Sequence, residues 1–149
     1  MGTPSMPASV MRAGRSDGDV VWNILGQTYR PVQWTASSFA FDTLFPPGTF
    51  VPPHIHPTQD EFIRVLEGDF ELVLGGGVDT ATAGDLIRLP RGIPHGIFNK
   101  SNAPVRALFW VAPALRLYEL FSQIHNVADP AEVVRLAALH DVAFLPPPA

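Results

Sequence analysis

The stretch GTFVPPHIHPTQDEFIRVLEG, residues 48–68, decides how this chain folds. It reads as a glycine, five residues, His54-x-His56, four residues, Glu61, six residues and a closing glycine. The two prolines at 52–53 exclude a helix before the histidines, because proline lacks an amide donor and favours an extended backbone before it. Alternate side chains of an extended segment share a face, so His54 and His56 point to the same side. Glu61, just beyond a short loop, can join them.

A second patterned stretch, GDLIRLPRGIPHGIFN at residues 84–99, supplies a fourth candidate ligand. It reads as a glycine, five residues, Pro-x-Gly, two residues, His95, three residues and Asn99. The prolines and glycine between 90 and 94 force a bend immediately before His95. Three imidazoles and one carboxylate form a site suited to iron, nickel, manganese, cobalt, copper or zinc, and the ligands alone do not choose among these metals.

The two stretches resemble, position for position, the two motifs of the cupin superfamily. The resemblance covers about residues 39–113, and the separation between the motifs, residues 69–83, is near the short end usual for microbial cupins. It implies an all-β fold, a jelly-roll type β-barrel with one divalent transition metal ion inside. The tail, residues 115–147, is similar to the quercetin dioxygenase-like branch of single-domain bacterial cupins.

The organisation of the chain agrees with one barrel domain. A chain of 149 residues is large enough for one sizeable core. Many short β-prone runs separated by glycine and proline indicate a sandwich or barrel even without the resemblance. We expect a flexible N-terminal arm at residues 1–19, the barrel at 20–113, and C-terminal helices and a tail packed on the barrel at 114–149.

Local patterns refine this division. The Gly68-Asp69 pair predicts a tight hairpin between two strands, and the glycines at 75–77 predict a turn. Apolar residues at helical spacing predict an amphipathic helix over about 114–125. Asp129 before Pro130 then predicts a second helix, with the aspartate as its N-cap. These helices are expected on the outside of the barrel or over one open end.

Each site residue carries a functional prediction and an alternative. We predict His54, His56, Glu61 and His95 as metal ligands. The resemblance to cupin dioxygenases also implies a catalytic role for Glu61, standing off the metal as a general base.

Strand parity predicts Phe41, Ile63 and Ile97 as pocket-lining residues, although each could equally be plain core. Gln59 and Asp60 could hydrogen-bond a ligand imidazole, but a solvated loop is the preferred interpretation. His125 and His140 are expected to be structural or solvent-facing.

Composition excludes several other classes. The net charge of −4 and the lack of a basic run argue against a nucleic-acid partner. No apolar run approaches the roughly 18 residues of a membrane span, and the first residues lack a signal-peptide core. Without cysteine there is neither a disulfide framework nor a thiolate ligand. A soluble, cytoplasmic protein is therefore expected.

Three functions are compatible with these patterns. The first is a metal-dependent oxidoreductase, a quercetinase-like dioxygenase acting on a small aromatic or enol-type substrate. The second is a non-oxidative lyase, isomerase or decarboxylase in which the metal acts only as a Lewis acid. The third is a small-molecule binding barrel without turnover, which a very apolar pocket would favour. Octahedral coordination by four ligands leaves two positions open, whereas tetrahedral coordination leaves none.

A homodimer is also expected. Cupins of this type commonly pair barrel to barrel, and the strand phase opposite the ligands exposes Phe62 and Leu66. The other predicted partner is a small-molecule substrate or ligand.

Overall fold

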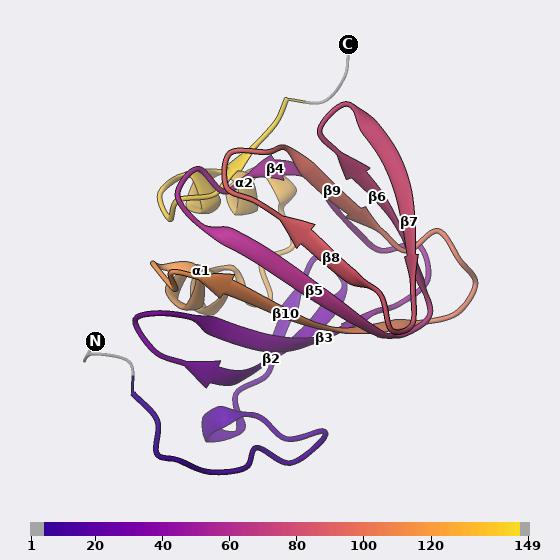
Figure 1. The fold of residues 1–149 in the computed structure, drawn as a ribbon. Coiled ribbons are helices and arrows are strands. Elements are labelled where there is room, and N and C mark those ends of the chain that lie inside the picture. Colours follow the sequence, from indigo (N-terminus) through magenta and orange to yellow (C-terminus); the bar gives the residue numbers. More distant parts are fainter. Residues whose placement is uncertain (1–4, 147–149) are drawn as a thin grey trace.

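The computed structural model describes residues 5–146 (Figure 1). In chain order its elements are η1 (Asp17–Asp19), β1 (Trp22–Ile24), β2 (Gln27–Trp34), β3 (Phe39–Phe45), β4 (Phe50–Ile55), β5 (Asp60–Glu67), β6 (Asp69–Leu74), β7 (Gly77–Thr82), β8 (Leu86–Leu89), β9 (His95–Phe98), β10 (Val105–Ala112), α1 (Leu117–Ile124), α2 (Pro130–Ala138) and β11 (Ala143–Phe144). The expected flexible arm includes η1, and its first four residues lie outside the described part of the chain.

The strands form two antiparallel sheets. One has the order β1-β2-β3-β10-β5-β8 and the other the order β11-β4-β9-β6-β7. Strands that follow one another in the chain often lie in different sheets, so the chain crosses repeatedly between the two layers (Figure 1). This arrangement confirms the predicted all-β, jelly-roll type fold with a C-terminal helical extension.

The core lies between the sheets because the strands alternate buried and more exposed residues. β3 buries every second residue, including Phe39, Phe41 and Phe45, whose exposed fractions are 0%, 1% and 0%. Its partner β10 follows the same alternation, with Phe109 directly opposite Phe41 and Val105 opposite Phe45. Side chains with a period of two therefore place one aromatic layer inside the barrel.

The C-terminal helices lie at one end of the two sheets (Figure 1). The short α1 buries one apolar face, made of Leu117, Leu120, Phe121 and Ile124. At the start of α2 the Asp129 carboxylate accepts a hydrogen bond from the amide of Ala131, at 3.0 Å, as the predicted N-cap requires. The chain then returns as β11, which pairs with β4 and places Phe144 opposite His54.

The predicted hairpin at Gly68 is wrong. β5 and β6, on either side of this glycine, belong to different sheets, so the turn is a crossing between layers. Gly68 has a φ of 86°, and a Cβ added there would lie 2.8 Å from the carbonyl oxygen of Pro104. The motif ends in glycine because the backbone turns left-handed against another backbone segment.

Replacing Gly68 by Ala should therefore lower the free energy of unfolding by about 2–3 kcal/mol, because a strained φ and a contact with backbone combine. Urea unfolding followed by circular dichroism measures this loss. Gly76→Ala is the matched control, since nothing lies within 4 Å of the added Cβ. A loss at position 68 no larger than at position 76 would contradict the steric argument.

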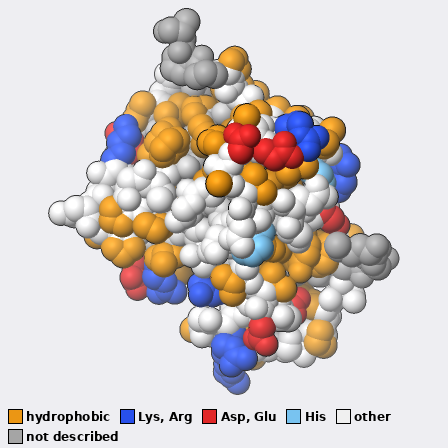
Figure 2. All heavy atoms as spheres, turned by 180° about the vertical axis from the view of Figure 1, so that it is seen from behind, with side chains coloured by type: hydrophobic (Ala, Val, Ile, Leu, Met, Phe, Trp, Pro, Cys, Tyr) orange, Lys and Arg blue, Asp and Glu red, His pale blue; other side chains and the backbone are white. Residues whose placement is uncertain are grey.

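The outer surface mixes side-chain types. On the face shown in Figure 2, several Lys and Arg side chains lie beside Asp or Glu side chains, among hydrophobic and polar atoms. Phe62 stacks on Trp110 with ring centroids 5.5 Å apart, and Leu66 is 44% exposed. The homodimer that these residues suggested stays a prediction. Among the described residues, no helix is long and apolar enough to cross a membrane.

Candidate metal centre

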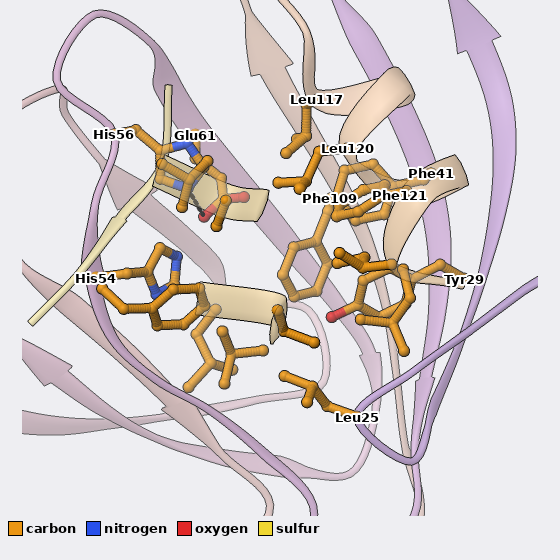
Figure 3. A pocket seen from close by; sticks show the side chains of 18 residues that line it. Leu25, Tyr29, Phe41, His54, His56, Glu61, Phe109, Leu117, Leu120 and Phe121 are labelled. Carbon is orange, nitrogen blue, oxygen red and sulfur yellow. Dashed lines mark ion pairs between the residues drawn. The ribbon is translucent and has the colours of Figure 1, made fainter. Parts of the chain in front are cut away.

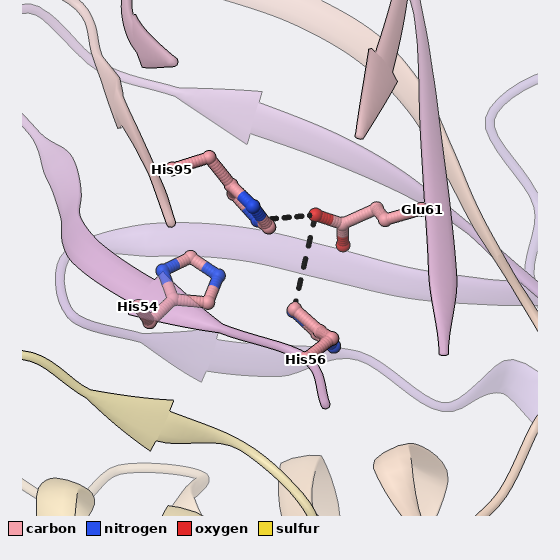
Figure 4. A group of neighbouring side chains, drawn as sticks. All are labelled: His54, His56, Glu61 and His95. Carbon is pink, nitrogen blue, oxygen red and sulfur yellow. Dashed lines mark hydrogen bonds and ion pairs between the residues drawn. The ribbon is translucent and has the colours of Figure 1, made fainter. Parts of the chain in front are cut away.

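Four side chains from both sheets converge inside the barrel (Figure 4). His54 near the end of β4 lies opposite His95 at the start of β9, in the five-stranded sheet. His56 follows β4 and shares the buried side of the chain with His54, as the alternation predicted. Glu61 comes from β5 in the six-stranded sheet. The group therefore joins the two layers.

The spacing of the donor atoms fits one metal ion. One ligand atom from each residue can be chosen so that all four lie within 4.8 Å of one another. With metal–ligand bonds of about 2.1 Å, atoms on opposite sides of an ion lie roughly 4 Å apart, so only a small contraction is needed. The Nε2 atom of His95 lies 3.0 Å from Oε2 of Glu61, and that of His56 lies 3.9 Å from the same oxygen. All four residues are buried, as a dry coordination site requires.

The outer nitrogen of each imidazole lies within hydrogen-bonding distance of an oxygen acceptor. Nδ1 lies 2.8 Å from the Pro52 carbonyl in His54, 2.7 Å from the Gln59 side-chain oxygen in His56, and 3.2 Å from the Ile93 carbonyl in His95. When Nδ1 donates to these acceptors, each Nε2 presents its lone pair to the centre. Three nitrogen atoms that direct their lone pairs toward one carboxylate are typical of a metal site.

Gln59 corrects the expectation of a solvated loop. It is 2% exposed, and its amide nitrogen donates to the carbonyls of Pro113 and Ala114, both at 2.9 Å. This pairing leaves the amide oxygen free to accept from His56. Asp60, in contrast, pairs with Arg91 nearer the surface, at 3.2 Å. The sequence did contain a signal for this role of Gln59. It is a side-chain amide three residues after the ligand His56, and an amide can donate and accept hydrogen bonds at the same time.

Replacing Gln59 by Leu should weaken metal binding by about 10–100-fold, because His56 loses the acceptor that orients it. Competition with a chromophoric chelator measures the affinity, and thermal unfolding checks that the variant is folded. Thr58→Ala, at the exposed neighbouring position, should bind metal like the wild type. An unchanged affinity in folded Gln59→Leu would show that His56 needs no such support.

The charge states suit a bound cation. Burial alone would raise the pKa of Glu61, but the facing imidazoles of His56, His95 and His54 outweigh it and lower the pKa to about 2. Burial, with help from the neighbouring histidines, lowers the pKa of His54 to about 3. At neutral pH the group therefore contains an ionised carboxylate and an uncharged His54, the forms that bind metals.

An apolar cavity of about 60 Å³ opens beside this group (Figure 3). Of the 18 residues drawn in Figure 3, the four with polar side-chain atoms are Tyr29, His54, His56 and Glu61. The apolar walls come from the barrel, both helices and β11. Three of the four members of the metal group thus face the cavity.

The structure separates the predicted pocket residues. Phe41 and Ile97 line the cavity. Ile63 does not, although parity turns it inward: it is fully buried between Phe109 on β10 and Ile87 on β8. Inward parity is shared along a whole strand, whereas the cavity covers only one end of it. His125 and His140 lie outside the group, where they bond to the backbone of Asn23 and Leu136.

The sequence interpretation missed the walls that the tail provides. Residues of α1, α2 and β11 line the cavity, among them Leu120, Phe121, Val133 and Phe144. The helical period indicated which face of α1 is apolar but not what that face covers. Tyr29 was also missed, because a tyrosine on an alternating strand gives no separate signal.

Comparison with known proteins identifies the domain. A family model described as a cupin domain matches residues 41–111. The Germin-like protein 9-3 of Oryza sativa subsp. japonica is 36% identical over 73 residues, which are 44% of this chain and 33% of that protein. The quercetin 2,3-dioxygenase of Bacillus subtilis (strain 168) is 28% identical over 151 residues, covering 93% of this chain and 39% of that protein. The chain thus spans well under half of the length of these curated relatives.

A solved structure supports the fold. An RmlC-like cupin from Shewanella frigidimarina NCIMB 400 superimposes with a TM-score of 0.60 at 22% identity, over 69% of this chain and 93% of that one. At this identity the similarity concerns the fold alone.

Proposed function

Because this chain is a member of the cupin superfamily, we propose that it binds one metal ion and works as a dioxygenase on a small aromatic or enol-type substrate. The observation that carries the proposal is the buried set of three imidazoles and one carboxylate in the wall of an apolar cavity. The similarity to a quercetin 2,3-dioxygenase along nearly the whole chain supports oxidative chemistry.

In this proposal His54, His56, Glu61 and His95 hold the metal. The chemistry that a bound divalent transition metal supplies is polarisation of a substrate oxygen and, for redox-active ions, one-electron transfer. The low pKa of Glu61 favours the role of ligand over that of general base, because a catalytic base works best with a pKa near the working pH. A dioxygenase adds both atoms of dioxygen to its substrate, so no external reductant is required.

The chain's own residues define how a substrate would lie. The aromatic rings of Phe41, Phe109 and Phe121 exclude water and pack against a flat apolar body. Tyr29 points its hydroxyl into the cavity (Figure 3) and donates to the side-chain oxygen of Gln27 at 2.6 Å. The Tyr29 oxygen can then accept a hydrogen bond from a substrate hydroxyl.

The cavity volume limits the substrate. A dry cavity of about 150 Å³ is known to bind benzene, whereas this one measures about 60 Å³. A compact enol, such as a short β-diketone, needs the least adjustment of the walls. A flavonol, with three rings, requires a much larger opening.

A binding barrel without turnover is the second candidate. The apolar walls favour it, because apart from the metal group the lining offers only the Tyr29 hydroxyl to a polar substrate. A lyase, isomerase or decarboxylase reaction would also use the same metal group without oxygen. Dependence on dioxygen separates these alternatives from the proposed function.

The test is oxygen uptake by iron-, nickel- and manganese-loaded protein with β-diketones, catechols and flavonols, and with His54→Ala as the control. Uptake that requires metal, is lost in the variant and is fastest with the short β-diketones supports the proposal. No uptake by protein that holds one metal ion per chain would overturn the dioxygenase and favour the non-oxidative or binding functions.

A further inference from the structure

The turn between β1 and β2 carries a leucine in an unfavourable backbone conformation. Leu25 and Gly26 are the two residues of this turn, and their φ angles are 52° and 83°. Positive φ at both positions defines a type I′ hairpin, which strongly prefers Asn-Gly because most side chains are strained there. A branched apolar residue at the first position needs a reason outside the turn itself.

The hairpin is held in place by the tail. The amide of Asn23 donates to Nδ1 of His125 at 2.9 Å, and the amide of Asn126 donates to the Asn23 carbonyl at 2.9 Å. The Asn23 side chain adds a bond to the Asn126 side chain at 3.2 Å. These contacts fix β1 against the connection between α1 and α2, so the strained residue stays where it is.

Leu25 lies between a cavity and a surface groove. One is the cavity beside the metal group, where Figure 3 shows the Leu25 side chain at the edge below Tyr29. The other is a surface groove of about 250 Å³, lined partly by Thr49, Phe50 and Val134. Among the described residues, only Leu25, Val133 and Phe144 line both the cavity and the groove. Val133 belongs to a helix and Phe144 to a paired strand, whereas Leu25 lies in a two-residue turn.

We propose that Leu25 determines the size of the ligand that reaches the metal group. With Leu25 in place, the cavity takes compact enol-type ligands. Without its side chain, the cavity continues into the groove and accepts ligands that carry an aromatic ring beyond the metal-binding head. The strained turn persists because it places an apolar side chain at this partition. This inference rests on the proposed function, since it assumes that the ligand's oxygen atoms bind at the metal group.

The test uses zinc-loaded protein, which binds without redox turnover, and two β-diketones with the same head. Calorimetry compares pentane-2,4-dione with 1,3-diphenylpropane-1,3-dione. Wild-type protein should bind the small diketone at least tenfold more tightly. Leu25→Gly, which suits the positive φ and so preserves the turn, should tighten binding of the diphenyl ligand about tenfold and change the small ligand less than threefold.

Two controls separate size from other effects. Leu25→Asn keeps both the turn and the bulk, so it should still exclude the diphenyl ligand. Val134→Ala alters only the groove and should leave the preference unchanged. Unchanged discrimination in a Leu25→Gly protein that binds zinc and pentane-2,4-dione would overturn this inference alone. Binding in the predicted order without oxygen uptake by any loaded form would overturn the dioxygenase and leave this inference standing, whereas a chain that binds no zinc would overturn both.

Discussion

His95→Ala and His54→Ala should each abolish stoichiometric metal binding. Each change removes one of four buried donors and leaves Glu61 facing fewer partners. His95 lies nearest to this carboxylate, with its Nε2 atom 3.0 Å from Oε2 of Glu61. In His54 the Pro52 carbonyl accepts from Nδ1, which leaves Nε2 as the nitrogen that binds the metal. Because affinity depends on the number of preset ligands, loss of one imidazole should lower the metal content from one ion per chain to about a tenth or less after dialysis.

Elemental analysis of dialysed protein measures this content, with thermal unfolding to verify the fold. His140→Ala is the matched control, because His140 is also largely buried but bonds to the Leu136 carbonyl away from the group. The His140→Ala protein should retain one metal ion per chain. A full equivalent in either ligand variant would contradict the assigned metal group, and loss in the His140 variant would point to a general effect of removing buried histidines.

The sequence predicted those parts of the centre that depend on local geometry. His54 and His56 share a face because a strand alternates, and two prolines exclude the helix that would separate them. Parity on β5 turns Glu61 inward together with Ile63. Such arguments need no knowledge of distant contacts. The fourth member, His95, lies on a distant strand and was predicted from the second motif and its resemblance to cupins, and the structure brings all four side chains together.

Features that depend on tertiary packing were not predictable. The turn at Gly68 looks like a hairpin in sequence, and only the sheet order shows that it crosses between layers. Gln59 looks like a loop residue until the carbonyls of Pro113 and Ala114 appear beside it, more than fifty positions along the chain. Strand parity could not show that Ile97 lines the cavity whereas Ile63 does not. Parity predicts the direction in which a side chain points but not where along the strand the cavity lies.

Phe121→Ala should lower the free energy of unfolding by about 3–5 kcal/mol. Phe121 is the apolar anchor of α1, with ring centroids 5.5 Å from Trp22, 5.1 Å from Tyr29 and 4.9 Å from Phe41. A helix of eight residues is not stable alone, so its docking depends on this face. The expected loss is a large share of the roughly 5–15 kcal/mol that stabilises a typical domain.

The same change should leave the metal group intact below the unfolding transition, because its ligands lie on or beside β4, β5 and β9 and none is on α1. Urea unfolding measures the first effect, and metal content at low temperature measures the second. Gln123→Ala, on the exposed side of the same helix, should change stability by less than about 0.5 kcal/mol. Loss of metal together with stability would show that the helix supports the ligands directly. Retention of metal in a destabilised chain would show that the barrel holds the ion without support from the Phe121 side chain.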